Sequence, residues 1–274
     1  MKGFVCMYAL EKLCQDIILP AEVTQQVLEL DKTLDVHQRF LLCNKETWEE
    51  GLNQVKRILG DDPDGFKMLT LMLHTAVERK SAYDEKGIPE EIYIASMSCF
   101  TRFVNEHLVS YGRYGFDRGF WTVRQLSLTL FRLGQLEYEI KVHEGQKMIS
   151  IHIPSDSKLE QKLLRQSYIT AKTFFAKYFP DYADVPYSCH SWLLSPNLKE
   201  ILPGTSRIRY FQDQFIILGT APGNDYRKWV FQRSDASVEN LPERTALQKN
   251  LKAFLLKGGI FHIGMGRLID DPFV

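Results

Sequence analysis

The chain has 274 residues and a mass of 31.8 kDa, which is enough for two domains with separate hydrophobic cores. Hydrophobic residues make up 45% of it and charged residues 25%, and 34 basic side chains balance 34 acidic ones. The zero net charge argues against a dedicated nucleic-acid-binding protein, because such proteins carry an excess of Lys and Arg on one face.

Membrane insertion, secretion and metal binding have no support in the sequence. The apolar run at the start is interrupted by Glu11, Lys12 and Gln15, and no run approaches the roughly 20 apolar residues of a membrane helix. The five cysteines include no CxxC pair, and no two of the seven histidines are three or four residues apart. We therefore expect a cytoplasmic protein with reduced core thiols, no membrane partner, no nucleic-acid partner and no metal.

Helical periodicity dominates residues 1 to about 108. Capping and turn residues predict helices over residues 4–14, 20–30 and 48–59, another from residue 62, and a single one from 88 to 108. Thr47 can cap the third of these helices and Gly60 can end it. Because the connections are short, we expect neighbouring helices to pack antiparallel as a bundle.

The amino-acid composition of the chain changes at residues 111–121. They carry three glycines and five aromatic side chains, a poor composition for a helix, and predict a boundary between domains 1–118 and 119–274. Aromatic rings interleaved with arginines can form the wall of a ligand site by stacking on a base or nucleotide ring. Ordered packing between the two domains is the alternative interpretation.

Period-two alternation follows the boundary. It predicts strands over residues 125–131, 136–142 and 148–153, with turns at Gly134 and at residues 143–146. A long helix follows to residue 179, then a strand over 187–194, a short helix over 196–202, and a hairpin of residues 215–220 with 228–232. A helix over 245–256 and a strand over 261–268 end the chain. The predicted fold class is α+β: an N-terminal helical bundle, then a mixed, mostly antiparallel sheet with a long central helix.

The junction between the third strand and the long helix is the candidate binding site. Pro154 should end the strand, and Ser157 with Glu160 makes a capping box that predicts a helix start at this point. Free backbone N–H groups and the positive end of the helix dipole suit a phosphate or carboxylate. Ordinary packing of a strand and a helix explains the same pattern without a ligand.

Three ionisable residues near that junction are candidate bases. His152 lies at the end of the strand, where a base would be useful, although a hydrogen-bonded structural histidine is the simpler interpretation. Glu137 and Glu139 project from one face of the neighbouring strand; they are base candidates if protein covers that face and surface charges if water does.

Cys189 and His190 are adjacent on a strand, so they point to opposite faces and cannot pair, and Cys189 is expected in the core.

Three segments, residues 113–121, 152–156 and 191–196, resemble a bacterial family of acyltransferases. In that family an N-terminal helical acyltransferase-associated domain precedes a GNAT-like C-terminal domain, and the order of elements here is similar to GNAT N-acyltransferases. The resemblance implies an acyl-CoA co-substrate, acetyl-CoA or another, and a small-molecule or peptide amine as acceptor. GNAT enzymes hold the CoA pyrophosphate with a glycine-containing turn before the central helix. The corresponding turn here, residues 154–158, has no glycine.

The same resemblance implies roles for individual residues. His152 or Glu137 would remove the proton of the amine, and Ser191 or Ser195 would lie near the thiolate leaving group. CoA would be held by the strand end and turn, which comprise Ile153, Ser155, Asp156, Ser157 and Lys158. The missing glycines favour a rival, a non-catalytic GNAT-like protein that binds a small molecule or peptide, and a third possibility is a structural partner in a larger assembly.

Overall fold

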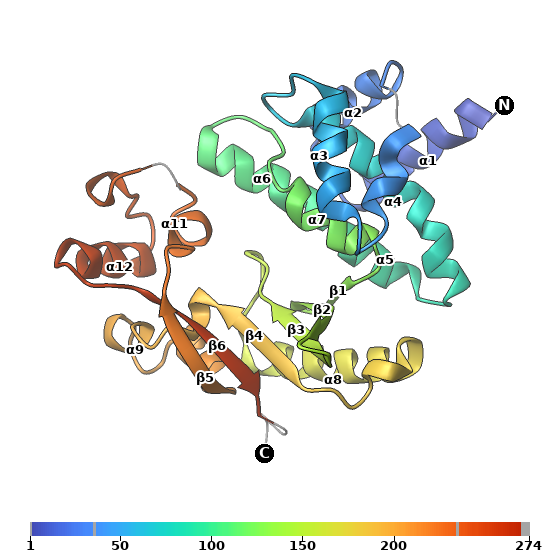
Figure 1. Ribbon diagram of the computed structural model, residues 1–274. Coiled ribbons are helices and arrows are strands. Elements are labelled where there is room, and N and C mark those ends of the chain that lie inside the picture. The colour runs from blue at the N-terminus through green and yellow to red at the C-terminus, as the bar shows by residue number, and fades with distance from the viewer. Residues whose placement is uncertain (1, 35–36, 234–235, 270–274) are drawn as a thin grey trace. The chain divides into compact units, whose positions relative to one another are not determined.

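The computed structural model describes residues 2–34, 37–233 and 236–269, and it divides into two compact units, Met1–Arg132 and Leu133–Val274 (Figure 1). The predicted boundary after residue 118 coincides with the start of helix α7 (Gly119–Leu126). Helix α7 packs against helices of the first unit, which places the division between units after Arg132. Within the described residues, no helix is both long enough and apolar enough to span a membrane.

The first unit is helical, as predicted. Its elements are α1 (Lys2–Asp16), α2 (Ala21–Asp31), the 3-10 helix η1 (His37–Leu42), α3 (Trp48–Leu59), α4 (Phe66–Glu85), α5 (Glu90–Met97), α6 (Cys99–Tyr111) and α7. Helix α4 is the centre of this unit, because every residue from 68 to 76 is buried and α1, α2, α3, α5 and α7 all pack against it. Its buried Thr70 and Thr75 hydroxyls donate to the carbonyls four residues earlier, so neither polar group is left unsatisfied.

Two predictions for this part of the chain are wrong. The single helix over residues 88–108 is two helices, α5 and α6, which meet at Ser98. The strand over 125–131 is wrong for residues 125–129, because Gln125 and Leu126 end α7 and Leu128 has a positive φ of 55°; the strand begins only at Leu130. Its alternating leucines suit a strand locally, but packing of α7 against α3 and α4 buries this segment as a helix.

A six-stranded sheet in the order β1-β2-β3-β4-β6-β5 organises the second unit. Its strands are β1 (Leu130–Leu133), within which the division between units falls, β2 (Leu136–His143), β3 (Gln146–His152), β4 (Tyr187–Ser191), β5 (Phe215–Pro222) and β6 (His262–Leu268). Strands β3 and β4 are parallel, whereas β2 with β3, β4 with β6, and β5 with β6 are antiparallel. The mixed, mostly antiparallel sheet with a long helix is confirmed.

Helix α8 (Gln161–Tyr178) covers one face of the sheet (Figure 1). Its Ser167 hydroxyl lies 3.0 Å from the Tyr138 hydroxyl of β2, and Leu164, Ala171 and Phe175 are buried. Tyr138 faces α8 and pairs with Ile151, so the alternation of β2 and β3 directs the intervening side chains to the other face. Those residues are Glu137, Glu139, Ser150 and His152.

Among the described residues, four α-helices lie in the chain between β4 and β6 of the second unit. They are α9 (Leu198–Ile201), α10 (Arg207–Gln212), α11 (Tyr226–Trp229) and α12 (Ala246–Leu256). The predicted hairpin between residues 215–220 and 228–232 is wrong, because β5 pairs with β6 and residues 226–229 are helical. Tyr226 and Phe231 are buried in a core with Leu251 of α12, and this core holds the segment as a helix. The strand predicted over 187–194 ends at Ser191.

Candidate active site

The ends of β2 and β3 bring an imidazole and a carboxylate together. The His152 Nε2 atom lies 2.7 Å from the Glu139 Oε2 atom, and the Nζ atom of Lys141 lies 3.3 Å from the same oxygen. Glu139 is 2% exposed, whereas the His152 side chain is 16% exposed and that of Lys141 41%. A buried carboxylate therefore links a nearly buried imidazole to a solvent-exposed ammonium group.

Glu137 lies on the same face and is equally buried, at 2% exposure. In the antiparallel register of β2 and β3 it is directly opposite His152, whereas Glu139 is opposite Ser150. The face that carries both glutamates is covered, which is the condition under which both were candidate bases. The short distance from His152 to Glu139 rather than to its register partner could not be seen in the sequence, because it depends on side-chain geometry across two strands.

Strands β3 and β4 share a register over only part of their length. The paired positions are Ile149 with Tyr187 and Ser150 with Ser188, whereas β3 continues to His152 and β4 to Ser191. Beyond Ser188, β4 stays paired with β6 on its other side. Among the described residues, the register of β3 with β4 therefore ends two residues before His152.

The turn after β3 differs from its prediction. The capping box of Ser157 and Glu160 is wrong: the helix begins at Gln161, and its N-cap residue Glu160 makes no side-chain cap bond. The Ser157 hydroxyl donates instead to the Gln135 carbonyl at 2.6 Å, and the Lys158 N–H donates to the Gln135 Oε1 atom at 2.7 Å. Gln135 thus tethers the turn, and two donors assigned to CoA already have protein partners.

The other residues of the turn lie as follows. Ser155 and Asp156 are exposed, and Ile153 is half-buried directly after His152. The Ser157 N–H donates to the Pro154 carbonyl at 3.0 Å, which closes the turn. The N–H groups of the first turn of α8 have no side-chain cap, so they are the donors that an anion at this point would meet.

Basic residues surround the start of α8. Lys158 and Lys162 flank it in the chain, and Arg207 of α10 reaches Glu160 with an Nη1 to Oε1 distance of 3.2 Å. Asp156 and Glu160 are acidic and oppose a phosphate, but Glu160 is neutralised in part by its ion pair with Arg207. The donor set therefore fits a pyrophosphate at the first turn of α8 better than at residues 155–158.

The two candidate serines lie at the end of β4 and just after it. The Ser191 Oγ atom accepts the N–H of Leu193 at 3.1 Å and caps the 3-10 helix Trp192–Leu194. Ser195 is fully buried, its hydroxyl lies 3.3 Å from the Asn197 Oδ1 atom, and its carbonyl accepts from the Gln212 side chain at 2.6 Å. Ser191 is partly exposed, and its hydroxyl, which accepts one hydrogen bond, can still donate its own proton. The Ser195 hydroxyl instead donates its proton to Asn197.

The remaining candidates from the sequence are Cys189, His190, a metal site and the aromatic segment of residues 111–121. Cys189 is fully buried, as expected, and burial raises the pKa of its thiol well above the usual value, while His190 is exposed. Among the described residues no group of three or more His, Cys, Asp or Glu side chains could hold a metal ion. In the aromatic segment, Arg113 pairs with Asp64 at 3.0 Å, and Gly115 packs against the His107 ring. Its role as a ligand wall stays a prediction.

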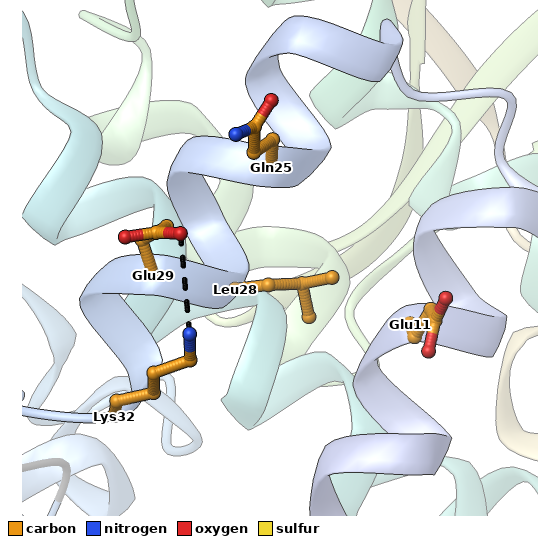
Figure 2. Close-up of a pocket in the computed structure, with 5 residues that line it drawn as sticks. All are labelled: Glu11, Gln25, Leu28, Glu29 and Lys32. Carbon is orange, nitrogen blue, oxygen red and sulfur yellow. Dashed lines mark ion pairs between the residues drawn. The ribbon is translucent and has the colours of Figure 1, made fainter.

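Figure 2 shows a pocket in the first unit, between α1 and α2. Its volume is about 270 Å³, and it is lined by Glu11, Gln25, Leu28, Glu29 and Lys32. Glu29 and Lys32 form an exposed ion pair at 3.9 Å within α2. None of the predicted catalytic or cofactor-binding residues lines this pocket.

Two protein families match the chain, one over each unit. Residues 130–268 match the family described as GNAT-like C-terminal domain, and residues 9–128 match the N-acyltransferase N-terminal domain. No curated protein matches the chain.

Solved structures show the same fold. An acyltransferase in complex with decanoyl-CoA and teicoplanin has a TM-score of 0.81 at 21% identity, and the match covers 94% of this chain and 86% of that one. An acyltransferase with CoA and 10C-teicoplanin has a TM-score of 0.78 at 22% identity, with the same coverage. Because the two matched families account for both units, the chain belongs to the family with a GNAT-like C-terminal domain, here preceded by an N-acyltransferase N-terminal domain.

Proposed function

We propose that the protein is an acyl-CoA-dependent N-acyltransferase that transfers an acyl group to the amine of a small molecule or peptide. The observation that carries the proposal is the His152–Glu139 pair at the end of β3, beside the point where β3 and β4 stop sharing a register, in a chain of this family. A proton acceptor then lies beside the end of the β3–β4 register, and acyl transfer to an amine requires a proton acceptor held close to the reacting groups.

The acyl donor would bind along the end of β3. The peptide groups of residues 151–153 would pair with its extended arm, and the first-turn N–H groups of α8 with Lys158 and Lys162 would hold its pyrophosphate. When bound, the thioester supplies an electrophilic carbonyl carbon and a thiolate leaving group. Ser191, at the end of β4, would donate its hydroxyl proton to the developing negative charge on sulfur.

His152 is the base in this proposal. With its Nε2–H donated to Glu139, its Nδ1 atom holds the lone pair that takes the proton of the attacking amine. The amine nitrogen bonds to the thioester carbonyl carbon, the C–S bond breaks, and its electron pair leaves with sulfur. Glu137 is buried directly opposite His152 in the register of β2 and β3.

A peptide-like acceptor is the first class to test. The structurally similar acyltransferase was solved with teicoplanin, a glycopeptide, together with decanoyl-CoA. Decanoyl-CoA, octanoyl-CoA and acetyl-CoA with a panel of amines that includes teicoplanin therefore form the starting set for an activity screen.

The rival proposal is a non-catalytic binding protein with the same fold. The observation in its favour is that Gln135 occupies the donors of Ser157 and Lys158, in a turn that carries the acidic Asp156. Such a protein would bind a small molecule or peptide at the same strand edge without turning it over.

A thermal-shift titration separates the two. We expect acetyl-, octanoyl- or decanoyl-CoA and free CoA to raise the melting temperature in proportion to the logarithm of ligand concentration, because a ligand bound only by the folded state stabilises it. Flat curves at millimolar ligand would contradict acyl-CoA binding and favour the rival. A rise without any acyl transfer across the amine panel would contradict catalysis but not binding.

A further inference from the structure

Lys141 and His152 approach one oxygen of a single buried carboxylate. The Glu139 Oε2 atom is 2.7 Å from His152 Nε2 and 3.3 Å from Lys141 Nζ, and Glu139 itself is 2% exposed. The side chains come from alternate positions of β2 and from the end of β3, so the rigid β2–β3 ladder fixes their separation. The arrangement does not rely on a flexible loop.

The chemistry of the three groups assigns a direction to the hydrogen bond. A carboxylate only accepts, so it selects the imidazole tautomer with the proton on Nε2. Burying a carboxylate is unfavourable unless it is paired, and the Lys141 ammonium favours the charged form of Glu139. Glu137, His143, Gln146 and Ser150 are the other polar residues of β2 and β3 on this face; His143 and Gln146 lie at its exposed end.

We propose that Glu139 is a positioning residue that holds His152 in the Nε2–H tautomer, and that Lys141 keeps Glu139 ionised for this task. The inference rests on the proposed acyl transfer, in which His152 Nδ1 takes the amine proton. The imidazolium that forms keeps its Nε2–H bond to Glu139, which stabilises the new charge. From the sequence, Glu139 was a candidate base on the same strand face as Glu137 and had no positioning role.

The test uses the full-length chain and two readouts. Nitrogen-15 NMR of the histidine side chains reports the tautomer of His152 without any substrate. Steady-state kinetics with an acyl-CoA and an amine that the wild-type protein accepts report kcat and KM. The variants are Glu139→Gln, which keeps shape but removes charge, Lys141→Met at an exposed position, and Glu137→Gln as the matched control for the tautomer.

In Glu139→Gln we expect His152 to leave the pure Nε2–H tautomer and kcat to fall about 10²- to 10⁴-fold, with KM for acyl-CoA within about twofold, because the wrong tautomer presents an N–H where a lone pair is needed. Lys141→Met should also lower kcat without changing KM, but by a smaller factor. If Glu139→Gln does not fold, Lys141→Met still tests whether an ionised Glu139 sets the tautomer of His152. Glu137→Gln should leave the tautomer unchanged. Glu144→Gln, in the exposed turn of the same hairpin, is the control for activity.

Unchanged tautomer and kcat within twofold of wild type in both Glu139→Gln and Lys141→Met would overturn the positioning role while leaving acyl transfer intact. No turnover by the wild-type protein would instead contradict the proposed function. The NMR measurement still decides in that case whether Glu139 controls the tautomer of His152.

Discussion

His152 is the side chain on which the proposed chemistry depends most directly. It ends β3, is 16% exposed, and bonds to a carboxylate that is almost completely buried. An exposed surface histidine would lose most of the benefit of such a pair to water and salt. Here the pair lies in a region where a fixed hydrogen bond can define the orientation of the ring.

Replacing His152 with Gln should abolish most of the activity without disrupting the fold. Gln can still donate a hydrogen bond to Glu139, but it cannot accept a proton, so we expect kcat to fall about 10²- to 10⁴-fold. Initial rates at saturating acyl-CoA, together with the melting temperature, would check this. His143→Gln, at the exposed end of β2, is the control. Full activity in His152→Gln would show that another group takes the proton.

At the scale of elements, two helices that both follow a threonine differ in whether that threonine forms an N-cap hydrogen bond. Thr245 caps α12 with a complete capping box, in which its hydroxyl accepts the Gln248 N–H at 3.2 Å and the Gln248 side chain accepts the Thr245 N–H at 3.2 Å. Thr47, which precedes α3 in the same way, makes no side-chain cap bond. The same residue type at the same helix position therefore has two different energetic roles.

Thr245→Ala should accordingly lower the free energy of unfolding by about 1 kcal/mol, since an N–H of the first turn loses its acceptor. Thr47→Ala is the matched control and should cost less than half as much. Urea denaturation followed by circular dichroism measures both. Equal losses in the two variants would show that the cap bond of Thr245 contributes little to stability.

At the scale of the whole molecule, several cysteine thiols and tyrosine hydroxyls are buried in their neutral form. Burial raises the pKa of the Cys14 thiol to about 12 and raises that of Cys189 further, while the ordinary value is 9.0. Burial likewise raises the pKa values of the hydroxyls of Tyr93 and Tyr187 above their ordinary 10.0. Each group therefore keeps its proton in the folded state at pH values where the unfolded chain loses it.

Stability should therefore fall in alkali. Above about pH 9 the unfolded chain loses thiol protons that the folded chain keeps, so the unfolded state binds fewer protons and the free energy of unfolding decreases as pH rises. Above about pH 10 the tyrosines add to the slope. Urea denaturation from pH 8 to 11 measures this, and Cys14→Ala with Cys189→Ala should move the start of the decline toward pH 10. Constant stability over this range would contradict it.

The fold class could be predicted from the sequence, because regular periodicity and strong turn residues are local properties. The helices starting at Ala21 and Trp48, the strands β2, β3 and β6, the long helix α8 and the buried Cys189 all follow from such patterns. Where two local patterns competed, tertiary packing chose between them: burial against α3 and α4 made residues 125–126 helical, and the core around Tyr226 replaced a predicted strand with α11.

The contacts within the candidate site could not be predicted from the sequence. The register of β2 on β3, the short distance from Glu139 to His152, and the Gln135 contacts that displace the start of α8 from Ser157 to Gln161 all join residues distant in the sequence. Period-two alternation names the residues that share a face, but it cannot say which of two neighbouring carboxylates reaches a histidine on another strand. Strand pairing and side-chain packing set that distance, and neither is a local property of the chain.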